Sequence, residues 1–542
     1  MKNIFKLLTI LIIITVLISN CTKKFDEINT NPKTLTTANL DASTYGFVIR
    51  TTIYFQMWLG NQLSFQTGKN LYLDVYANYF ATTAPNFLSD RYVMVGGWLS
   101  GIFNNFYVRS ATHLKYALDY AKENDLAVEE AMMKIWKVYS YNRYTDLVGP
   151  MVYSSFGNME KSVPYDKQED IYTNFFKLLD EANAVLKANA GKTSAIFATY
   201  DPIYAGKVDL WQKFGSSLRL RLALRVKYVK PELAKTQAEK AIAEGVMTSN
   251  ADNGWVKTTT DWYNTYTLIT QWGEFRMSAD MESFLKGYAD PRVSAYFSEA
   301  KAPDLSDDPA GLVFKFEGMR NGQSKNDRSA FNFNNMNSDM AAPYLKAGDK
   351  GPNMFVMRAF ECYFLRAEGA LEGWNMGGTT ESLYKSGIET SLAENGFANL
   401  KNLKGEVYST STLVPASPGA DGSAPTVIQA PVSTVPVAFM TGGTKEQKLE
   451  QIITQKWIGL YPDSGEAYAE RRRTRYPKLF DRLDSENPDV PKTSIPARLT
   501  YWSNEYNTNN AEVLKAITML NAESSNPQGD KANTKLWWDK KP

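Results

Sequence analysis

Apolar residues recur every three to four positions along most of the chain after residue 44, which is the spacing of one buried helix face. The stripe over 127–144 consists of Val128, Met132, Ile135, Val138, Tyr139 and Asn142. The same pattern predicts further helices over 111–122, 170–189, 209–229, 234–244, 353–374, 379–396 and 444–461. Thr444 and Gln447 predict a capping box at the start of the last of these helices.

Successive helices have the lengths of antiparallel pairs, but no strict 34-residue repeat is present. We therefore predict a mostly α fold of degenerate tetratricopeptide-like pairs with minor β structure. Two segments break the helical pattern: 246–350 is rich in Asn, Asp, Gly and aromatic residues, and 405–443 is almost uncharged. Because no sharp boundary separates independent domains, we predict one helical domain over 45–542 with both segments as loop insertions.

The N-terminus carries a different pattern. Lys2 and Lys6 flank the start of an uncharged apolar run over 7–18, which is shorter than the roughly 20 residues of a membrane-spanning helix and fits a secretory signal. The stretch LISNC, ending at Cys21, resembles a bacterial lipobox, in which the cysteine thiol takes a diacylglycerol. We predict a lipoprotein signal over 1–20, lipidation of Cys21 and a polar tether over 21–44. The alternative is an uncleaved signal anchor.

Charge and cysteine content narrow the function further. Removing 1–20 removes two lysines and no acid, which leaves 58 basic and 58 acidic residues without a polybasic stripe. Nucleic acid is therefore not an expected partner, because phosphate binding needs clustered Lys and Arg. Cys362 has no partner for a disulfide once Cys21 is lipidated. The fold must rest on its hydrophobic core.

Most catalytic devices are missing from the sequence. His113 is the only histidine, which excludes a metal site built on a histidine and cysteine cluster, and we expect it to be structural. Neither a nucleophile elbow nor a phosphate-binding glycine loop is present. Paired carboxylates stay open, because a glycosidase needs only two acids. We predict no cofactor, while calcium bound by loop carboxylates and carbonyls is left open.

The run ERRRTR, Glu470 to Arg475, has the side chains to bind a phosphate or a carboxylate. However, Glu466 and Glu470 precede the arginines at helical spacing. We therefore interpret the run as i,i+4 ion pairs on a structured surface.

Several segments together resemble one family, the SusD/RagB-like outer-membrane nutrient-binding lipoproteins and specifically their SusD-like subgroup. The segments are NRYTDLVGPMVYS (142–154), WQKFGSSLRLRLALRV (211–226), DPRVSAYF (290–297), EQIITQKWIGLYPDSGEAYAERRRTRYPKL (450–479) and the terminal LWWDK (536–540). They follow the family's order over nearly the whole chain after Cys21. The segment 405–443 has no counterpart in this resemblance.

The resemblance implies a mostly helical fold with four degenerate tetratricopeptide-like pairs. One face would dock on a SusC-like TonB-dependent transporter in the outer membrane, and loops on the other side would capture an oligosaccharide or a peptide. The protein would bind its ligand without chemistry, lipid-anchored and exposed at the cell surface.

Ligand contacts are expected from loops, since helix faces are needed for packing. Two aromatic-rich segments combine flat rings, which stack on sugars, with polar groups that reach hydroxyls. The first, 78–98, offers Asn86, Phe87, Arg91 and Tyr92, with Trp98 as a weaker candidate expected in the core. The second, 255–275, offers Trp262, Tyr263, Tyr266 and Trp272.

Three functions are weighed on these features. A non-catalytic nutrient-binding lipoprotein explains the lipobox and the ordered motifs. A glycoside hydrolase on a helical scaffold would need a carboxylate pair in an aromatic cleft. A helical scaffold for protein partners would bind no small ligand.

Overall fold

The computed structural model describes residues 41–83, 86–158, 160–324, 336–419 and 429–542. Its α-helices are α3 (Ala42–Gln56), α4 (Gln62–Ser64), α5 (Gly96–Phe103), α6 (Thr112–Glu123), α7 (Ala127–Val148), α8 (Gln168–Ala188), α9 (Ala195–Tyr200), α10 (Val208–Arg225), α11 (Pro231–Glu244), α12 (Tyr266–Ile269), α13 (Ala279–Gly287), α14 (Val293–Tyr296), α17 (Ala359–Leu371), α18 (Thr380–Glu394), α19 (Lys445–Leu460), α20 (Ser464–Thr474), α21 (Glu505–Thr508) and α22 (Asn510–Glu523).

Five 3₁₀ turns, two π-helices and four short strands complete the described structure. The 3₁₀ turns are η3 (Leu88–Arg91), η5 (Asn250–Asp252), η6 (Thr270–Trp272), η7 (Ala342–Tyr344) and η8 (Tyr408–Thr410). The π-helices are η2 (Phe65–Asp74) and η4 (Asn104–Ala111). The strands are β1 (Phe80–Thr82), β2 (Gly254–Val256), β3 (Phe275–Met277) and β4 (Met354–Met357).

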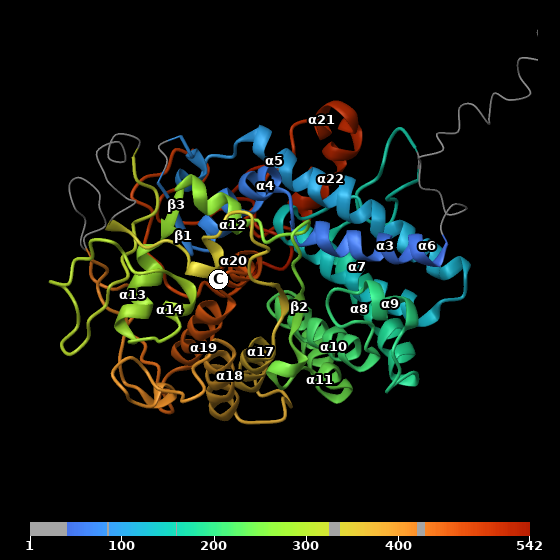
Figure 1. Ribbon diagram of the computed structural model, residues 1–542. Helices are drawn as coiled ribbons and strands as arrows, with labels where there is room; N and C mark the ends of the chain where they lie inside the picture. Colours follow the sequence, from blue (N-terminus) through green and yellow to red (C-terminus); the bar gives the residue numbers. More distant parts are fainter. Residues whose placement is uncertain (1–40, 84–85, 159, 325–335, 420–428) are drawn as a thin grey trace, which may run out of the picture.

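The predicted mostly α fold is confirmed. Helix α6 packs on α7, α7 on α8, α10 on α11, and α17 on α18, so neighbours in sequence are neighbours in space. Figure 1 shows these helices filling the right and lower parts of the molecule, while loop-rich segments lie on the left. The capping box at Thr444 and Gln447 is also present. The number of tetratricopeptide-like pairs stays a prediction.

Two details of the predicted pattern are wrong. The predicted helix over 353–374 begins only at Ala359, because 354–357 forms strand β4 against β2. The segment 246–350 is not merely a loop, since it contains β2, α12, β3, α13 and α14. These elements are three to nine residues long, which is too short for a periodic pattern to be recognised.

The described parts of 405–443 pack against helices. Tyr408 is buried, and its hydroxyl donates to Asp290 Oδ2 at 2.5 Å. Gln451 of α19 donates through Nε2 to the carbonyl oxygens of Pro436 and Ala438, at 2.7 and 2.8 Å. These bonds fix the two ends of the segment to the helical body.

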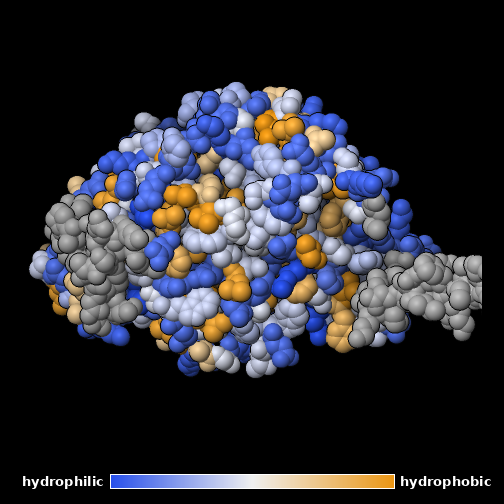
Figure 2. Space-filling model, turned by 90° about the horizontal axis from the view of Figure 1, so that it is seen from above, coloured by the Kyte–Doolittle hydropathy of each residue, from blue (hydrophilic) through white to orange (hydrophobic). Residues whose placement is uncertain are grey.

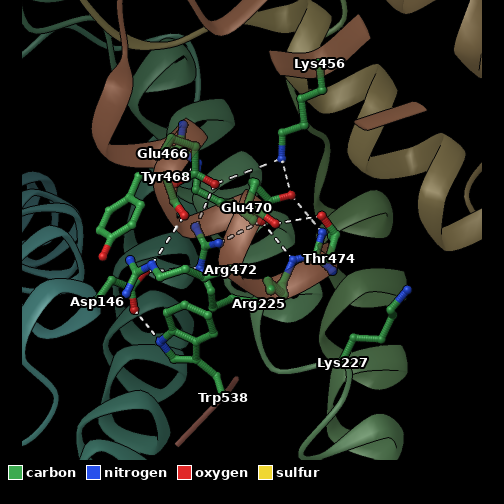
Figure 3. A network of polar contacts seen from close by, with 12 residues as sticks. Asp146, Arg225, Lys227, Lys456, Glu466, Tyr468, Glu470, Arg472, Thr474 and Trp538 are labelled. Atoms are coloured by element: carbon green, nitrogen blue, oxygen red, sulfur yellow. Dashed lines mark hydrogen bonds and ion pairs between the residues drawn. The ribbon is translucent and has the colours of Figure 1, made fainter. Parts of the chain in front are cut away.

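Helix α20 lies in a buried ionic network (Figure 3). Arg225 of α10 pairs with Glu466 and Glu470, both at 2.7 Å, and contacts Asp146 of α7 at 3.1 Å. Glu470 also accepts from Lys456 of α19 at 3.0 Å and from Arg473 at 2.7 Å. The interpretation of this run as surface pairs is therefore wrong, because two other helices, α10 and α19, bring cations to both acids. Helical spacing within one segment cannot show such contacts.

Buried hydrophobic residues from Tyr45 to Trp538 form one continuous cluster. The predicted tether ends slightly earlier than expected, because Asp41 caps α3 and the helix begins at Ala42. The predicted signal, Cys21 and the remainder of the tether lie outside the described residues. Among the helices that the structure describes, none has the length and apolar character needed to span a bilayer.

Candidate functional site

The two segments predicted to contact a ligand lie side by side. Strand β1 lies within the first and pairs antiparallel with β3, which begins at the last residue of the second. The ladder continues past β1: Thr83 donates from its backbone nitrogen to the Glu274 carbonyl at 2.9 Å and from its hydroxyl to the Gly273 carbonyl at 2.6 Å. Residues about 190 positions apart in sequence therefore border one surface.

Five of the eight predicted ligand residues reach solvent on this side. Asn86 is exposed, Trp272 is 40% exposed, and Phe87, Trp262 and Tyr263 are half-buried. The four aromatic rings among them are partly covered by the protein, and the rest of each ring is exposed to solvent. This is the arrangement of an amphipathic side chain that can stack on a sugar ring.

Each half-buried ring has a defined support. Phe87 packs edge-on against Trp98, with ring centroids 5.9 Å apart. Trp262 packs on Tyr54 of α3 at 4.9 Å. Tyr263 donates from its hydroxyl to Gln62 Oε1 at 3.1 Å. The positions of Trp262 and Tyr263 are therefore set by α3 and α4, outside the two segments, and that of Phe87 by α5.

The other three predicted residues are buried and already paired. Arg91 is 1% exposed, contacts Glu486 at 2.5 Å and donates to the Gln323 carbonyl at 3.2 Å. Tyr266 is fully buried and donates to Asp74 Oδ2 at 2.7 Å.

Tyr92 is also buried, with the Arg482 guanidinium 4.9 Å from its ring centroid. Direct ligand contact by Arg91, Tyr92 and Tyr266 does not fit this burial, and the polar groups of Arg91 and Tyr266 are already bonded within the protein. The amino-acid composition identified the two segments as candidates, but it could not show which of their side chains are buried and which are exposed.

A cavity of about 90 Å³ adjoins the second segment at Asn264. Aromatic side chains form much of its wall, and amides and charged groups interrupt them. The aromatic lining residues are Trp58, Phe106, Tyr139, Tyr144, Tyr344 and Phe355. The polar lining residues are Gln56, Lys69, Asn105, Arg143, Asn264, Asn353 and Asp463. Mixed apolar walls with a few fixed polar groups are typical of small-molecule sites.

Irregular backbone surrounds this cavity. Both π-helices border it, η2 through Lys69 and Leu73 and η4 through Asn105 and Phe106. Trp58 has φ of 61°, in the left-handed region that bulky residues rarely adopt. π-Helical turns and such strained residues occur frequently at functional sites.

Trp58 is held in its strained conformation by its neighbours. Its carbonyl accepts from the Thr265 hydroxyl at 2.8 Å, which ties it to the second aromatic segment. Its ring lies so close to Gly68 of η2 that a Cβ there would approach it to 2.6 Å. The absent side chain of Gly68 therefore makes room for the ring.

The charged edge of the cavity is an ion pair. Arg143 donates to both carboxylate oxygens of Asp463, each at 2.6 Å. Burial alone would raise the pKa of Asp463, but the contact with Arg143 holds it at about 2. Among the described residues that line the cavity, Asp463 is the one acid, and at neutral pH it carries no proton to donate. The carboxylate pair that a hydrolase requires is not found in this lining.

Sequence reasoning missed most of the cavity wall. Trp58, Arg143 and Phe355 lie on segments that were assigned to helices or loops without a site. Only the sequence Trp58-Leu59-Gly60, an aromatic residue beside a helix-breaking glycine, offered a signal. His113, in contrast, is where it was expected: its Nδ1 lies 2.6 Å from the Arg109 carbonyl oxygen, its ring packs on Phe55, and burial lowers its pKa.

The face that carries the two segments is mixed in polarity. Elements α4, α5 and β3 lie toward the top of Figure 1, and Figure 2 views the molecule from that side. Small apolar patches are separated there by hydrophilic groups. Such a surface offers stacking and hydrogen bonding within short reach of each other.

The model of the SusD-like family, described as SusD and RagB outer membrane lipoproteins, matches residues 27–539. Among curated proteins, none matches the sequence.

Solved structures agree with the family match. A chitin-binding SusD homologue from Flavobacterium johnsoniae is 33% identical, with a TM-score of 0.78 over 91% of this chain and 98% of that one. A SusD homologue from Bacteroides thetaiotaomicron is 30% identical, with a TM-score of 0.80 over 93% of this chain and 100% of that one. The chain therefore belongs to the SusD/RagB family of outer membrane lipoproteins.

Proposed function

We propose that this protein is a non-catalytic capture protein that binds an oligosaccharide and delivers it to a SusC-like transporter in the outer membrane. The observation that carries the proposal is the joining of two aromatic segments and an aromatic-lined cavity on one side of the fold. Membership of the SusD/RagB family supports it, as does the similarity to a homologue described as chitin-binding.

The proposed contacts divide by chemistry. Trp262, Tyr263, Trp272 and Phe87 would stack on sugar rings through their open faces. Asn86, which is exposed at the surface, would bond to hydroxyl groups.

Non-catalytic action is supported by the chemistry of the cavity. Glycosidases place a second carboxylate within about 5–9.5 Å of a proton-donating acid. Asp463 is the single acid of the lining and is ion-paired with Arg143. Capture followed by release intact to a transporter requires no such group.

The proposed location is the outer membrane, with Cys21 carrying the lipid and the ligand face exposed at the cell surface. The family description as outer membrane lipoproteins supports this location. Several acyl chains, each stabilised by about 0.8 kcal/mol per buried CH₂, would hold the protein stably at the membrane.

The experiment that tests the proposal is a titration of the full chain, purified in detergent, with neutral oligosaccharides, chito-oligosaccharides and peptide mixtures. Calorimetry would measure binding, and chromatography of the same samples would detect new products. We expect saturable binding of one glycan class without products. Products would support a hydrolase. Binding of peptides alone would show that the ligand is a peptide and not a glycan, and no binding would favour the protein-scaffold alternative.

A double variant, Trp262→Ala with Trp272→Ala, would assign the site. We expect it to weaken glycan binding at least tenfold, because aromatic stacking contributes about 0.5–1.5 kcal/mol per pair beyond burial. Trp374→Ala is the matched control, since Trp374 is also half-buried but follows α17 in a different part of the fold. Equal loss in both variants, or loss of cooperative unfolding in the double variant, would contradict the assignment.

A further inference from the structure

The C-terminal end of α20 borders a second cavity, of about 500 Å³. It differs in place and character from the aromatic cavity, which is bordered by Asp463 and Gly465 at the other end of the same helix. Helix α20 has 11 residues, so the two ends are about 16 Å apart. No residue lines both cavities, and the lining of the second is mostly polar, with four cations, three carboxylates and four apolar residues.

Arg472 forms part of the buried wall of this second cavity. It is 1% exposed, and its guanidinium lies 3.9 Å from the Tyr468 ring centroid and 5.0 Å from that of Trp538. Figure 3 shows it beside both rings and next to the ionic network. Yet among the described residues no carboxylate oxygen lies within 4.0 Å of its nitrogens. Its neighbour Arg473 pairs with both Glu368 and Glu470.

The hydrogen bonds of Arg472 are incomplete as well. Nε donates to the Tyr468 carbonyl at 3.3 Å and Nη1 to the Ala497 carbonyl at 2.9 Å. Nη2 is buried without a partner among the described residues. A buried guanidinium normally has all its donors satisfied, because leaving one unpaired costs the desolvation energy of a charged group. Nη2 of Arg472 is therefore free to bond to an acceptor in the cavity that this side chain lines.

Two more cations line the same space without carboxylate partners in the described structure. Arg471 donates to the Asn78 amide oxygen at 3.1 Å, and Lys535 is half-buried. Burial lowers the pKa of both Arg471 and Arg472, which reflects desolvation that nearby acids do not offset.

Two of the three acids in the lining are ion-paired, Asp539 with Arg475 of the same lining and Asp489 with Lys531 outside it. Asp539 accepts from Arg475 at 2.7 Å, and Asp489 accepts from Lys531 at 2.9 Å. Asp481 lies exposed at the rim. Of the four cations in the lining, Arg471, Arg472 and Lys535 have no carboxylate partner in the described structure, and Asp481 is the one acid there without an ion pair.

The helix dipole does not by itself explain this arrangement. Cations near a helix C-terminus are favoured by the partial negative charge there, which accounts for arginine at 471 and 472. That effect requires no cavity, however, and supplies no acceptor for Nη2 of Arg472.

We propose that this second cavity binds a small oxyanion, a carboxylate, sulfate or phosphate group, either as a free ion or as a charged substituent of a saccharide. Arg472 would donate from the floor, while Arg471 and Lys535 would donate from the sides. The exposed hydroxyls of Thr493 and Ser494 at the rim would complete the contacts. This site is separate from the proposed glycan face and does not depend on it.

The test is calorimetric titration of the full chain in detergent with sodium sulfate and, separately, with sodium glucuronate. Sodium chloride keeps the ionic strength constant, so that general screening does not appear as binding. We expect saturable binding of at least one probe. Sulfate alone would indicate a free inorganic ion, and glucuronate alone would indicate a charged sugar; both outcomes support an oxyanion site.

Charge-neutralising variants make the assignment specific. Lys535→Gln and Arg471→Gln should each weaken binding by about tenfold, because each removes a charge-assisted hydrogen bond. Lys492→Gln is the matched control: Lys492 is exposed, lies next to the rim in sequence and does not line the cavity. It should change affinity less than twofold.

Three results would overturn the proposal. They are no saturable binding of either probe, unchanged affinity in both Lys535→Gln and Arg471→Gln, or an equal loss in Lys492→Gln. Binding of neutral oligosaccharide, measured on the same variants, should stay within twofold of the unmodified chain. That measurement separates failure of this site from failure of the proposed glycan face and also shows that the variants are folded.

Discussion

At the scale of single residues, the aromatic cavity depends on one missing side chain. Trp58 adopts φ of 61°, and its ring occupies the space that a Cβ of Gly68 would need. Trp58 and Gly68 belong to different elements, so neither local propensity nor helical spacing relates them. The contact explains why a glycine lies within η2, although every residue type except proline favours helix formation more than glycine does.

Replacing this glycine tests the contact. Gly68→Ala should destabilise the protein by about 1–3 kcal/mol, because the new methyl group meets the Trp58 ring at 2.6 Å and Ile102 at 2.9 Å. Displacement of Trp58 should also weaken oligosaccharide binding. Gly97→Ala is the control, since a Cβ at Gly97 meets nothing within 4 Å. Chemical denaturation and calorimetry check both effects, and equal behaviour of the two variants would contradict this role of Gly68.

Glu317 offers a second residue-scale prediction, through pH. Burial and the nearby Glu282 carboxylate raise the pKa of Glu317 to about 9. Between pH 4.5 and 9 the unfolded chain releases this proton and the folded protein keeps it. The contribution of Glu317 to stability is therefore full below pH 4.5 and declines as pH rises, by at most about 1.4 kcal/mol per pH unit.

Glu317→Gln should remove this slope and make the protein more stable than the unmodified chain at pH 8. The free energy of unfolding at pH 5, 6.5 and 8 measures it. Glu381→Gln serves as the control, because the Glu381 side chain is 39% exposed and pairs with Lys385 and Thr441 near the surface. A pH slope that persists in Glu317→Gln would place the effect on another group.

At the scale of elements, α20 contacts helices that are distant in sequence and borders both cavities. Its acids receive cations from α10 and α19, its first residues border the aromatic cavity, and its last residues border the basic cavity. A helix with this much charge would ordinarily lie at the surface. Here it lies inside because other helices supply the opposite charges.

Removing one of these acids should be costly. Glu470→Gln leaves Arg225, Lys456 and Arg473 without a shared partner, and we expect a loss of about 3–5 kcal/mol at pH 7. Glu381→Gln, which breaks an exposed pair with Lys385, should cost less than about 1 kcal/mol.

The same variant has a distinctive pH dependence. Burial would raise the pKa of Glu470, but Arg473 and Lys456 hold it well below its ordinary value of 4.5. Its stabilisation is present above pH 4.5 and lost as pH falls below that value. The difference in the free energy of unfolding between Glu470→Gln and the unmodified chain, measured by chemical denaturation, should therefore become smaller from pH 5 to pH 3. A constant gap would mean that packing, not charge, causes the loss.

The elements also show how far sequence reasoning reached. Long amphipathic helices such as α8 and α19 were predicted because burial on one face repeats over many turns. Strand β4 was mistaken for the start of α17, because four apolar residues carry no distinguishable period. Of the candidate site, the two aromatic loops were predicted. Their juxtaposition through β1 and β3, and the burial of Arg91 and Tyr266, arise from long-range contacts that no local pattern encodes.

At the scale of the whole molecule, the two cysteines are expected to behave oppositely. Cys362 is buried in α17, and burial raises the pKa of its thiol to about 12, so it stays protonated and unreactive at neutral pH. Cys21 lies outside the described residues and follows the apolar run that we predict to be a signal. If Cys21 carries the lipid, membrane attachment depends on Cys21 and not on Cys362.

Cys21→Ala should therefore release the protein from the membrane pellet of the producing cells, while Cys362→Ala, the matched control, should remain in it. Without acyl chains the attachment loses about 0.8 kcal/mol per buried CH₂, far more than weak surface contacts can replace. Fractionation followed by mass spectrometry of the N-terminal peptide checks both the location and the modification. Sedimentation of Cys21→Ala with membranes would indicate an uncleaved signal anchor, whereas release of Cys362→Ala would show that fractionation reports misfolding and not lipid attachment.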